Sequence, residues 1–136
     1  MSRTLIIDSR NRASGESPSN FILNMTPPLY NVRNVKLAYA SIPVIDGADQ
    51  LYWCVSIPEL GLHTRGSNGD ASKCTFSIPI TSGGGYRSFF NSMSSYEPIA
   101  NGNGETLTRL HIRLHYPDGS YVLTNDEDIL IILQLE

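Results

Sequence analysis

The side chains that could bind a metal ion are three histidines and a short run of acids. His111 and His115 lie four residues apart in a segment of alternating polarity, so in a strand their Cα atoms are about 13 Å apart and cannot share one ion. His63 stands alone in a polar stretch. The acidic run at 126–128 is too short to supply the roughly six to eight oxygens that a calcium ion requires. We therefore predict surface histidines and no metal site.

Motifs that activate a nucleophile or bind a phosphate are also missing. The three glycines at 83–85 lack the Lys-Ser/Thr pair that follows in a phosphate-binding loop, and no Gly-x-Ser-x-Gly sequence occurs. Cys54 and Cys74 lack redox-pair spacing and lie in apolar runs, where a free cysteine acts as a small hydrophobe; free thiols are favoured over a disulfide. We predict no catalytic residue, no cofactor and no enzyme activity.

The composition fits one small domain rich in turns. The chain has 136 residues with 40% hydrophobic and only 17% charged residues, and its 11 glycines and 8 prolines suit short strands joined by turns. The net charge of −3 argues against nucleic-acid binding, which needs a basic face. We expect neither a signal peptide nor a membrane span, because no apolar run approaches the length that either requires.

Charge is distributed unevenly along the chain. Residues 1–36 carry five basic side chains against two acidic ones, whereas residues 105–136 carry six acidic against two basic. Opposite ends of opposite sign can support head-to-tail contact between copies, although the same charges can simply cover a solvated surface. We expect an extended N-terminal arm over about residues 1–20, in which Arg10 and Arg12 reach a neighbour's carboxylates; an ordinary N-terminal hairpin is the alternative.

Alternating polarity predicts β-strands throughout. In 106–116, Leu110, Ile112, Leu114 and Tyr116 fall on one face, and Arg109, His111, Arg113 and His115 fall on the other, wet face. The sequence Pro-Asp-Gly-Ser at 117–120 predicts a turn, after which 120–124 should return as a hairpin partner. The segment 128–135 is apolar on both faces, which is typical of a central strand.

The remaining strands and connections indicate the fold class. The other expected strands are 3–8, 20–25, 33–43, 51–57 and 73–80, with a weaker one around 88–90. Two connections, 58–72 and 81–105, are too long for plain turns, and the second holds Tyr86, Phe89, Phe90 and Tyr96, so it either caps the domain or forms an interaction surface. We predict an all-β, antiparallel two-sheet sandwich, a single jelly roll of about eight strands over residues 1–136.

The order of short motifs also resembles a known group of viral proteins. The pattern DSR-x-R (8–12), PS-x-F (18–21) and PL-x-x-V-x-x-V-x-L-x-x-x-x-IP (28–43) is similar to the opening of penton-type and minor capsid proteins. These belong to the double-jelly-roll lineage of double-stranded DNA viruses, such as virophages, large DNA viruses and tectivirus-like viruses. LTRLHIRLHYPDGSYV (107–122) and DILIILQLE (128–136) resemble the closing strands of the same proteins.

The resemblance implies a structural virion protein, made in the host cytoplasm. It would form a homopentamer at the icosahedral five-fold vertices and contact the major capsid protein, and it could support a spike or an internal membrane protein. The chain is short and has no second domain for a receptor-binding head, so we expect a plug or base. The candidate subunit contacts are Arg10, Arg12, Tyr86, Phe89, Phe90, Asp126, Glu127 and Asp128.

Two other classes of function stay open on the sequence. A carbohydrate- or ligand-binding β-sandwich would expose aromatic side chains, and Tyr52, Trp53 and the Phe89–Phe90 loop could serve in that way. An enzyme on a cupin-like barrel would need clustered histidine and carboxylate ligands, which the histidine spacing opposes. Another minor capsid, cement or spike-base role is the nearest variant of the capsid interpretation.

Overall fold

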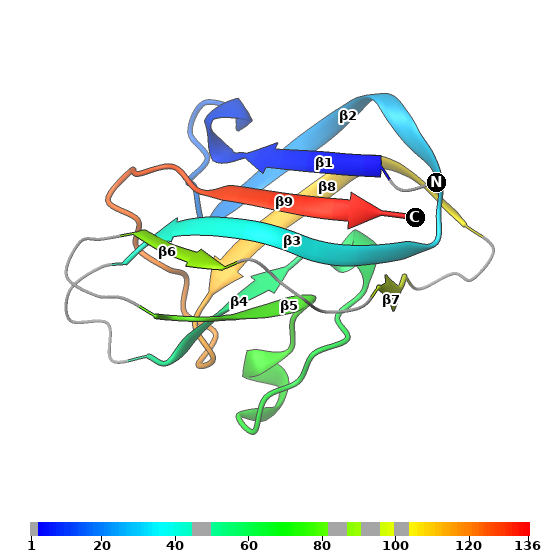
Figure 1. Cartoon of the computed structure of the whole chain (residues 1–136). Coiled ribbons are helices and arrows are strands. Elements are labelled where there is room, and N and C mark those ends of the chain that lie inside the picture. Colours follow the sequence, from blue (N-terminus) through cyan, green and yellow to red (C-terminus); the bar gives the residue numbers. More distant parts are fainter. Residues whose placement is uncertain (1–2, 45–49, 82–86, 91–95, 100–103) are drawn as a thin grey trace.

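Two antiparallel sheets pack face to face in the computed structural model, which describes residues 3–44, 50–81, 87–90, 96–99 and 104–136 (Figure 1). The first sheet has the order β1 (Arg3–Asp8), β9 (Leu130–Leu135), β3 (Asn34–Pro43) and β6 (Arg87–Phe90), and the short β7 (Glu97–Pro98) also pairs with β3. The second sheet has the order β2 (Asn20–Val32), β8 (Glu105–His115), β4 (Tyr52–Ser56) and β5 (Phe76–Pro79).

The chain crosses between the two sheets at almost every connection. β1 and β3 belong to the first sheet, whereas β2 lies between them in sequence and belongs to the second. The hairpin of β4 and β5 stays in the second sheet, after which β6, β8 and β9 alternate again. This alternation, with β9 between β1 and β3 and β8 between β2 and β4, is the jelly-roll topology. The predicted fold class is confirmed.

The core lies between the sheets and follows the predicted alternation. Leu110, Ile112 and Leu114 of β8 are completely buried, which confirms the face assigned to them. Phe21 of β2 faces Ile112 across the strand pair and is also completely buried. β9 is central, as expected, and it buries Ile131, Leu133 and Leu135 in the same core. Alternating apolar residues on the central strands of both sheets therefore form most of the interior.

β2 is longer than the predicted strand 20–25. It extends to Val32 through two prolines, which cannot donate a hydrogen bond to a neighbouring strand. The pairing with β8 shifts between Asn24 and Leu29, so the prolines fall where the regular ladder is interrupted. The sequence predicted a stop at the prolines, but pairing resumes at Leu29 opposite Leu107.

The predicted strand 120–124 is wrong. The turn itself forms: the Asp118 carboxylate accepts a hydrogen bond from the Ser120 amide at 2.9 Å, and Gly119 has the positive φ of 91° expected there. Only one bridge, between His115 and Tyr121, follows the turn, together with a bond from the Val122 amide to the Leu114 carbonyl. The chain then leaves the second sheet, because its next strand, β9, belongs to the first.

His115 is buried, so the predicted wet face is wrong at that position. A covering segment, residues 58–74, folds over the outer face of the second sheet, and a pair of backbone bonds between Thr64 and Cys74 closes it. The segment carries two short 3₁₀ helices, η2 (Pro58–Leu60) and η3 (Gly69–Ser72). It leaves His115 only 8% exposed, whereas His111, whose backbone amide donates to the Glu59 carboxylate of the same segment, stays partly exposed. The cover comes from a distant part of the chain, which periodicity within one strand does not reveal.

The N-terminal residues, which we expected as an extended arm, lie against the domain. β1 pairs with β9 along its whole length, from Arg3 opposite Leu135 to Asp8 opposite Leu130. A single 3₁₀ turn, η1 (Ser9–Asn11), follows, and the Arg12 guanidinium then holds the next bend by donating to the carbonyls of Ser9 and Glu16. Residues 3–8 are therefore an integral strand of the first sheet.

Ile112 gives a direct test of the core assignment. We expect Ile112→Ala to lower the free energy of unfolding by about 2–5 kcal/mol, because it removes completely buried methyl groups and leaves a cavity. Arg109→Ala, on the exposed face of the same strand, is the control, and its effect should stay within about 0.5 kcal/mol. Urea denaturation measures both, and equal losses would mean that the two faces of β8 are assigned wrongly.

Candidate functional site

Apolar side chains meet on the outer face of the first sheet, which no other element covers among the described residues. Cross-strand pairing puts Ile6 of β1 opposite Ile132 of β9, and Ile132 opposite Tyr39 of β3. Paired residues point to the same side of a sheet, and the residues on either side of Ile6 and Ile132 point into the core. These three side chains therefore form one row that faces outward. Ile6 is 59% exposed.

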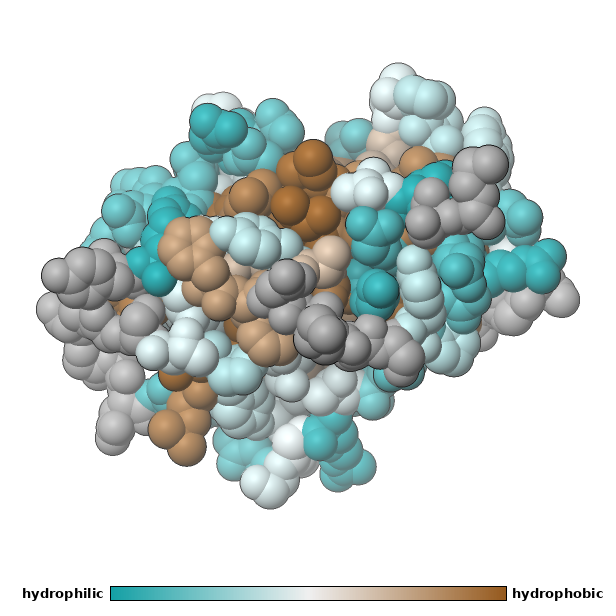
Figure 2. Space-filling model, in the orientation of Figure 1, coloured by the Kyte–Doolittle hydropathy of each residue, from teal (hydrophilic) through white to brown (hydrophobic). Residues whose placement is uncertain are grey.

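A second row extends this surface toward β6. Leu130 pairs with Ser41, and Ser41 pairs with Phe89, so these residues also face outward. The rings of Tyr39 and Phe89 lie 5.9 Å apart and are tilted by 46°, which links the two rows. Phe89 is 57% exposed. We call Ile6, Tyr39, Phe89, Leu130 and Ile132 the apolar face; it lies on the side of the molecule that Figure 2 shows, where brown surface covers the middle of the first sheet.

The predicted aromatic contacts divide between the two sides of the first sheet. Phe89 belongs to the apolar face, whereas Phe90 pairs with the buried Ala40 and packs partly against the core. Tyr86 lies outside the described residues. Tyr96, which the sequence placed in the same loop, receives the Lys36 ammonium 4.9 Å from the centre of its ring. One of the three predicted aromatics is therefore available on this surface.

Charged residues gather at one end of the apolar face. Asp8, Arg10, Glu127 and Asp128 line a hollow of about 390 Å³, together with Leu130. The Arg10 guanidinium donates to both oxygens of Asp8, with the shortest contact at 2.6 Å, and these bonds hold the pKa of Asp8 below its ordinary value. Arg10 stays largely exposed. Three of the predicted contact residues thus border the apolar face.

Arg12 and Asp128 are ion-paired within one chain. The Arg12 guanidinium lies 2.6 Å from Asp128 Oδ1, which also accepts a hydrogen bond from the Ser9 hydroxyl at 2.9 Å. The Ser9 oxygen in turn accepts the amide of Ile129 at 2.8 Å, and Ser9 is completely buried. This network fixes the turn after β1 to the residues before β9. The opposite charges that the sequence suggested for two copies meet here inside a single copy.

The structure places the other two acidic candidates differently. Asp126 and Glu127 are exposed in the turn that precedes β9, and Asp126 has a positive φ of 61°. No hydrogen bond from another described side chain reaches either carboxylate, so both are available to a partner in this part of the chain. Glu127 lies beside Arg10 in the charged hollow, whereas Asp126 lines a different one next to Asn125.

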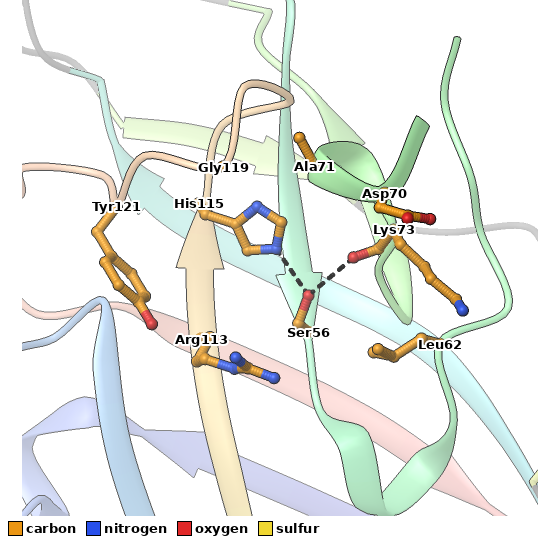
Figure 3. Close-up of a pocket in the computed structure, with 9 residues that line it drawn as sticks. All are labelled: Ser56, Leu62, Asp70, Ala71, Lys73, Arg113, His115, Gly119 and Tyr121. Carbon is orange, nitrogen blue, oxygen red and sulfur yellow. Dashed lines mark hydrogen bonds between the residues drawn. The ribbon is translucent and has the colours of Figure 1, made fainter. Parts of the chain in front are cut away.

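The sequence analysis missed a polar pair beneath the covering segment. The Ser56 oxygen lies 2.7 Å from His115 Nε2 (Figure 3). His115 Nδ1 lies 3.0 Å from the Tyr116 carbonyl. A carbonyl only accepts, so Nδ1 carries a hydrogen and donates it to Tyr116. The two residues are 59 positions apart and lie in no motif, so the alternation that puts each on an outward position is the only signal in the sequence.

This pair resembles the hydroxyl and base of a nucleophilic enzyme, but its surroundings suit a structural role. Ser56 is 2% exposed, which leaves little of its hydroxyl open to a substrate. Its oxygen also lies 3.4 Å from the Lys73 carbonyl in the covering segment. The pair therefore satisfies polar groups that the covering segment buries.

The two cysteines lie near this pair and are free thiols, both buried. Their mutual hydrogen bond and burial raise the pKa of Cys74 far above its ordinary value. The described residues hold no group of three histidine, cysteine or acidic side chains arranged to bind a metal ion. None of the helices in the described part of the chain is long and apolar enough to cross a membrane.

Comparison of the sequence with known protein families and with curated proteins found no match.

The Asp128 network predicts unequal effects of two neighbouring acids. Asp128→Ala should lower the free energy of unfolding by about 1–3 kcal/mol, because it leaves the buried Ser9 hydroxyl and the Arg12 guanidinium without their acceptor. Glu127→Ala, one residue away and exposed, should change stability by no more than about 0.5 kcal/mol. Urea denaturation compares them, and similar values would show that the network contributes nothing measurable.

Proposed function

We propose that this chain is a structural virion protein, a penton that forms pentamers at icosahedral five-fold vertices and contacts the major capsid protein. The apolar face on the first sheet is the observation that carries the proposal. Solvent-exposed apolar patches of this kind mark protein contacts, and here the patch occupies the middle of a regular sheet rather than a pocket. A spike or an internal membrane protein is a further possible partner in the particle.

The fold and the resemblance support the same proposal. Jelly rolls are common in viral capsid proteins, although the fold alone does not fix a function. The resembling segments, 8–43 and 107–136, contain nearly all of four strands, β2, β3 and the central β8 and β9. The proposed number of copies in the ring, five, rests on the resemblance to penton-type proteins.

Physical considerations favour the apolar face over charge as the main source of contact energy. Exposed ion pairs contribute at most about 1 kcal/mol each, whereas buried apolar area contributes about 25 cal/mol per Å². A closed ring requires that one patch meet a different patch on the next copy. The exposed Arg10 and Glu127 then serve orientation and selectivity at the rim of the apolar face. Arg12 is already paired with Asp128 and would join an interface as part of that network.

The rival ligand-binding module lacks its main aromatic platform. Trp53, one of the residues that would have stacked on a sugar, is 1% exposed and belongs to the core. Tyr52 is partly buried, and Phe89 lies on a broad sheet face rather than at a loop rim. We therefore place assembly ahead of carbohydrate binding.

A reconstruction of the virus particle tests the proposal. We expect density for this chain at the five-fold axes, with the apolar face in contact with protein; density anywhere else would end the vertex proposal.

Substitution tests the same surface independently. Phe89→Ser should reduce incorporation into particles at least several-fold while leaving the fold intact, because the ring is exposed. Leu123→Ser, at a 74% exposed leucine outside the apolar face, is the matched control and should incorporate normally. Equal incorporation of both variants would mean that the apolar face makes no essential contact.

A further inference from the structure

A hollow of about 280 Å³ lies on the outer face of the second sheet, on the opposite side of the sandwich from the apolar face. Arg113 and His115 of β8 and Ser56 of β4 form its floor, and Asp70, Ala71 and Lys73 of the covering segment form one wall. Figure 3 shows Arg113 and His115 projecting from the same strand toward the space beside Ser56. The strand pairing requires this, because Ser56 and Arg113 are cross-strand partners.

Arg113 is held in this hollow without a partner for its buried nitrogen. Its Nε is inaccessible to solvent and makes no hydrogen bond to the described residues. A buried, unpaired donor costs free energy, so an arginine kept in this position is not explained by stability of the empty domain. Arg109 lies four residues earlier on the same side of β8 and is exposed, as is usual for a surface arginine.

The neighbours of Arg113 leave its guanidinium available. His115 uses Nδ1 on the Tyr116 carbonyl and Nε2 on the Ser56 hydroxyl, so it neither competes for an acceptor nor offers one. Lys73 brings a second positive charge to the wall, and Asp70 brings one negative charge without an ion pair to either cation. The charged side chains of the lining, Arg113, Lys73 and Asp70, together carry a net charge of one positive unit.

We propose that this hollow binds a carboxylate group, with the Arg113 guanidinium as its main donor and Lys73 as a second cation. An arginine fork matches a carboxylate with two parallel hydrogen bonds, and a bound carboxylate would place a negative charge against a guanidinium that has no ion pair among the described residues. A monoanion fits the net charge of the lining better than a doubly charged phosphate, which Asp70 would repel. The source is either a small free carboxylate or an acidic side chain of a partner protein.

Nuclear magnetic resonance titration of the isolated ¹⁵N-labelled chain tests this proposal. Sodium acetate and a short glutamate-containing peptide are the two probes, at constant ionic strength, with sodium chloride as the blank. We expect at least one of them to shift the amide signals around Ser56, Lys73 and Arg113 in a saturable way. Saturation by acetate indicates a small-molecule site, and saturation by the peptide alone indicates a docking site for protein. Inorganic phosphate should bind more weakly than the better carboxylate.

Matched arginine variants decide which residue binds. Arg113→Gln should weaken the affinity at least tenfold without lowering the thermal unfolding midpoint, because the lost Nε–H has no partner in the empty domain. Arg109→Gln should leave the affinity unchanged. Lys73→Gln alters an exposed side chain, so it should keep the fold and weaken the affinity by a smaller factor, which preserves the test if Arg113→Gln does not fold.

Three results would overturn the proposal. These are no saturable shift with either carboxylate, equal affinity in Arg113→Gln and Arg109→Gln, and phosphate binding tighter than both carboxylates. The measurements use the single chain in solution, so their outcome does not depend on whether the vertex proposal is correct.

Discussion

β9 carries apolar residues on both of its sides, and this is the constraint on which the arrangement of the domain depends. One side of the strand places Ile131, Leu133 and Leu135 in the core, completely buried. The strand must then have neighbours on both edges, and β1 and β3 supply them. Its other side still carries Leu130 and Ile132, which the sandwich cannot bury because the second sheet covers only one face. The same strand therefore closes the core and creates the exposed apolar face.

The two outer faces of the sandwich differ in what covers them. The outer face of the second sheet carries polar groups, including Ser56 and His115, which bond to each other. Residues 58–74 fold over this face, and the Lys73 carbonyl lies 3.4 Å from the Ser56 hydroxyl. The outer face of the first sheet carries apolar groups and has no such cover in the described part of the chain. One face is covered from within the chain, whereas no described residue covers the other. This asymmetry is why assembly explains the domain better than a ligand cleft in the core.

The charge pattern has a different meaning in three dimensions than along the chain. A basic start and an acidic end suggested contact between copies, but β1 and β9 are neighbouring antiparallel strands, so the segments that follow β1 and precede β9 meet at the same edge. Arg12 and Asp128 consequently pair inside the chain. Among the described residues, what is left for a partner is Arg10, whose side chain is exposed beside Asp8, and the exposed Glu127 carboxylate of the turn before β9. An interface would therefore use apolar area first and these charges at its rim.

The sequence by itself determined the fold class, most strands and the buried side of β8, because these depend on local periodicity and on turn residues such as Gly119. The tertiary structure decided features that depend on segments distant in sequence. Residues 58–74 cover His115. After Val122 the chain passes to the other sheet, which ends the hairpin that the turn at 117–120 begins. Pairing with β9 holds β1 on the domain. Ser56, His115 and Arg113 meet because β4 and β8 are neighbours in a particular register. Register between strands dozens of residues apart is set by packing of the whole core, so no spacing within either strand reveals it.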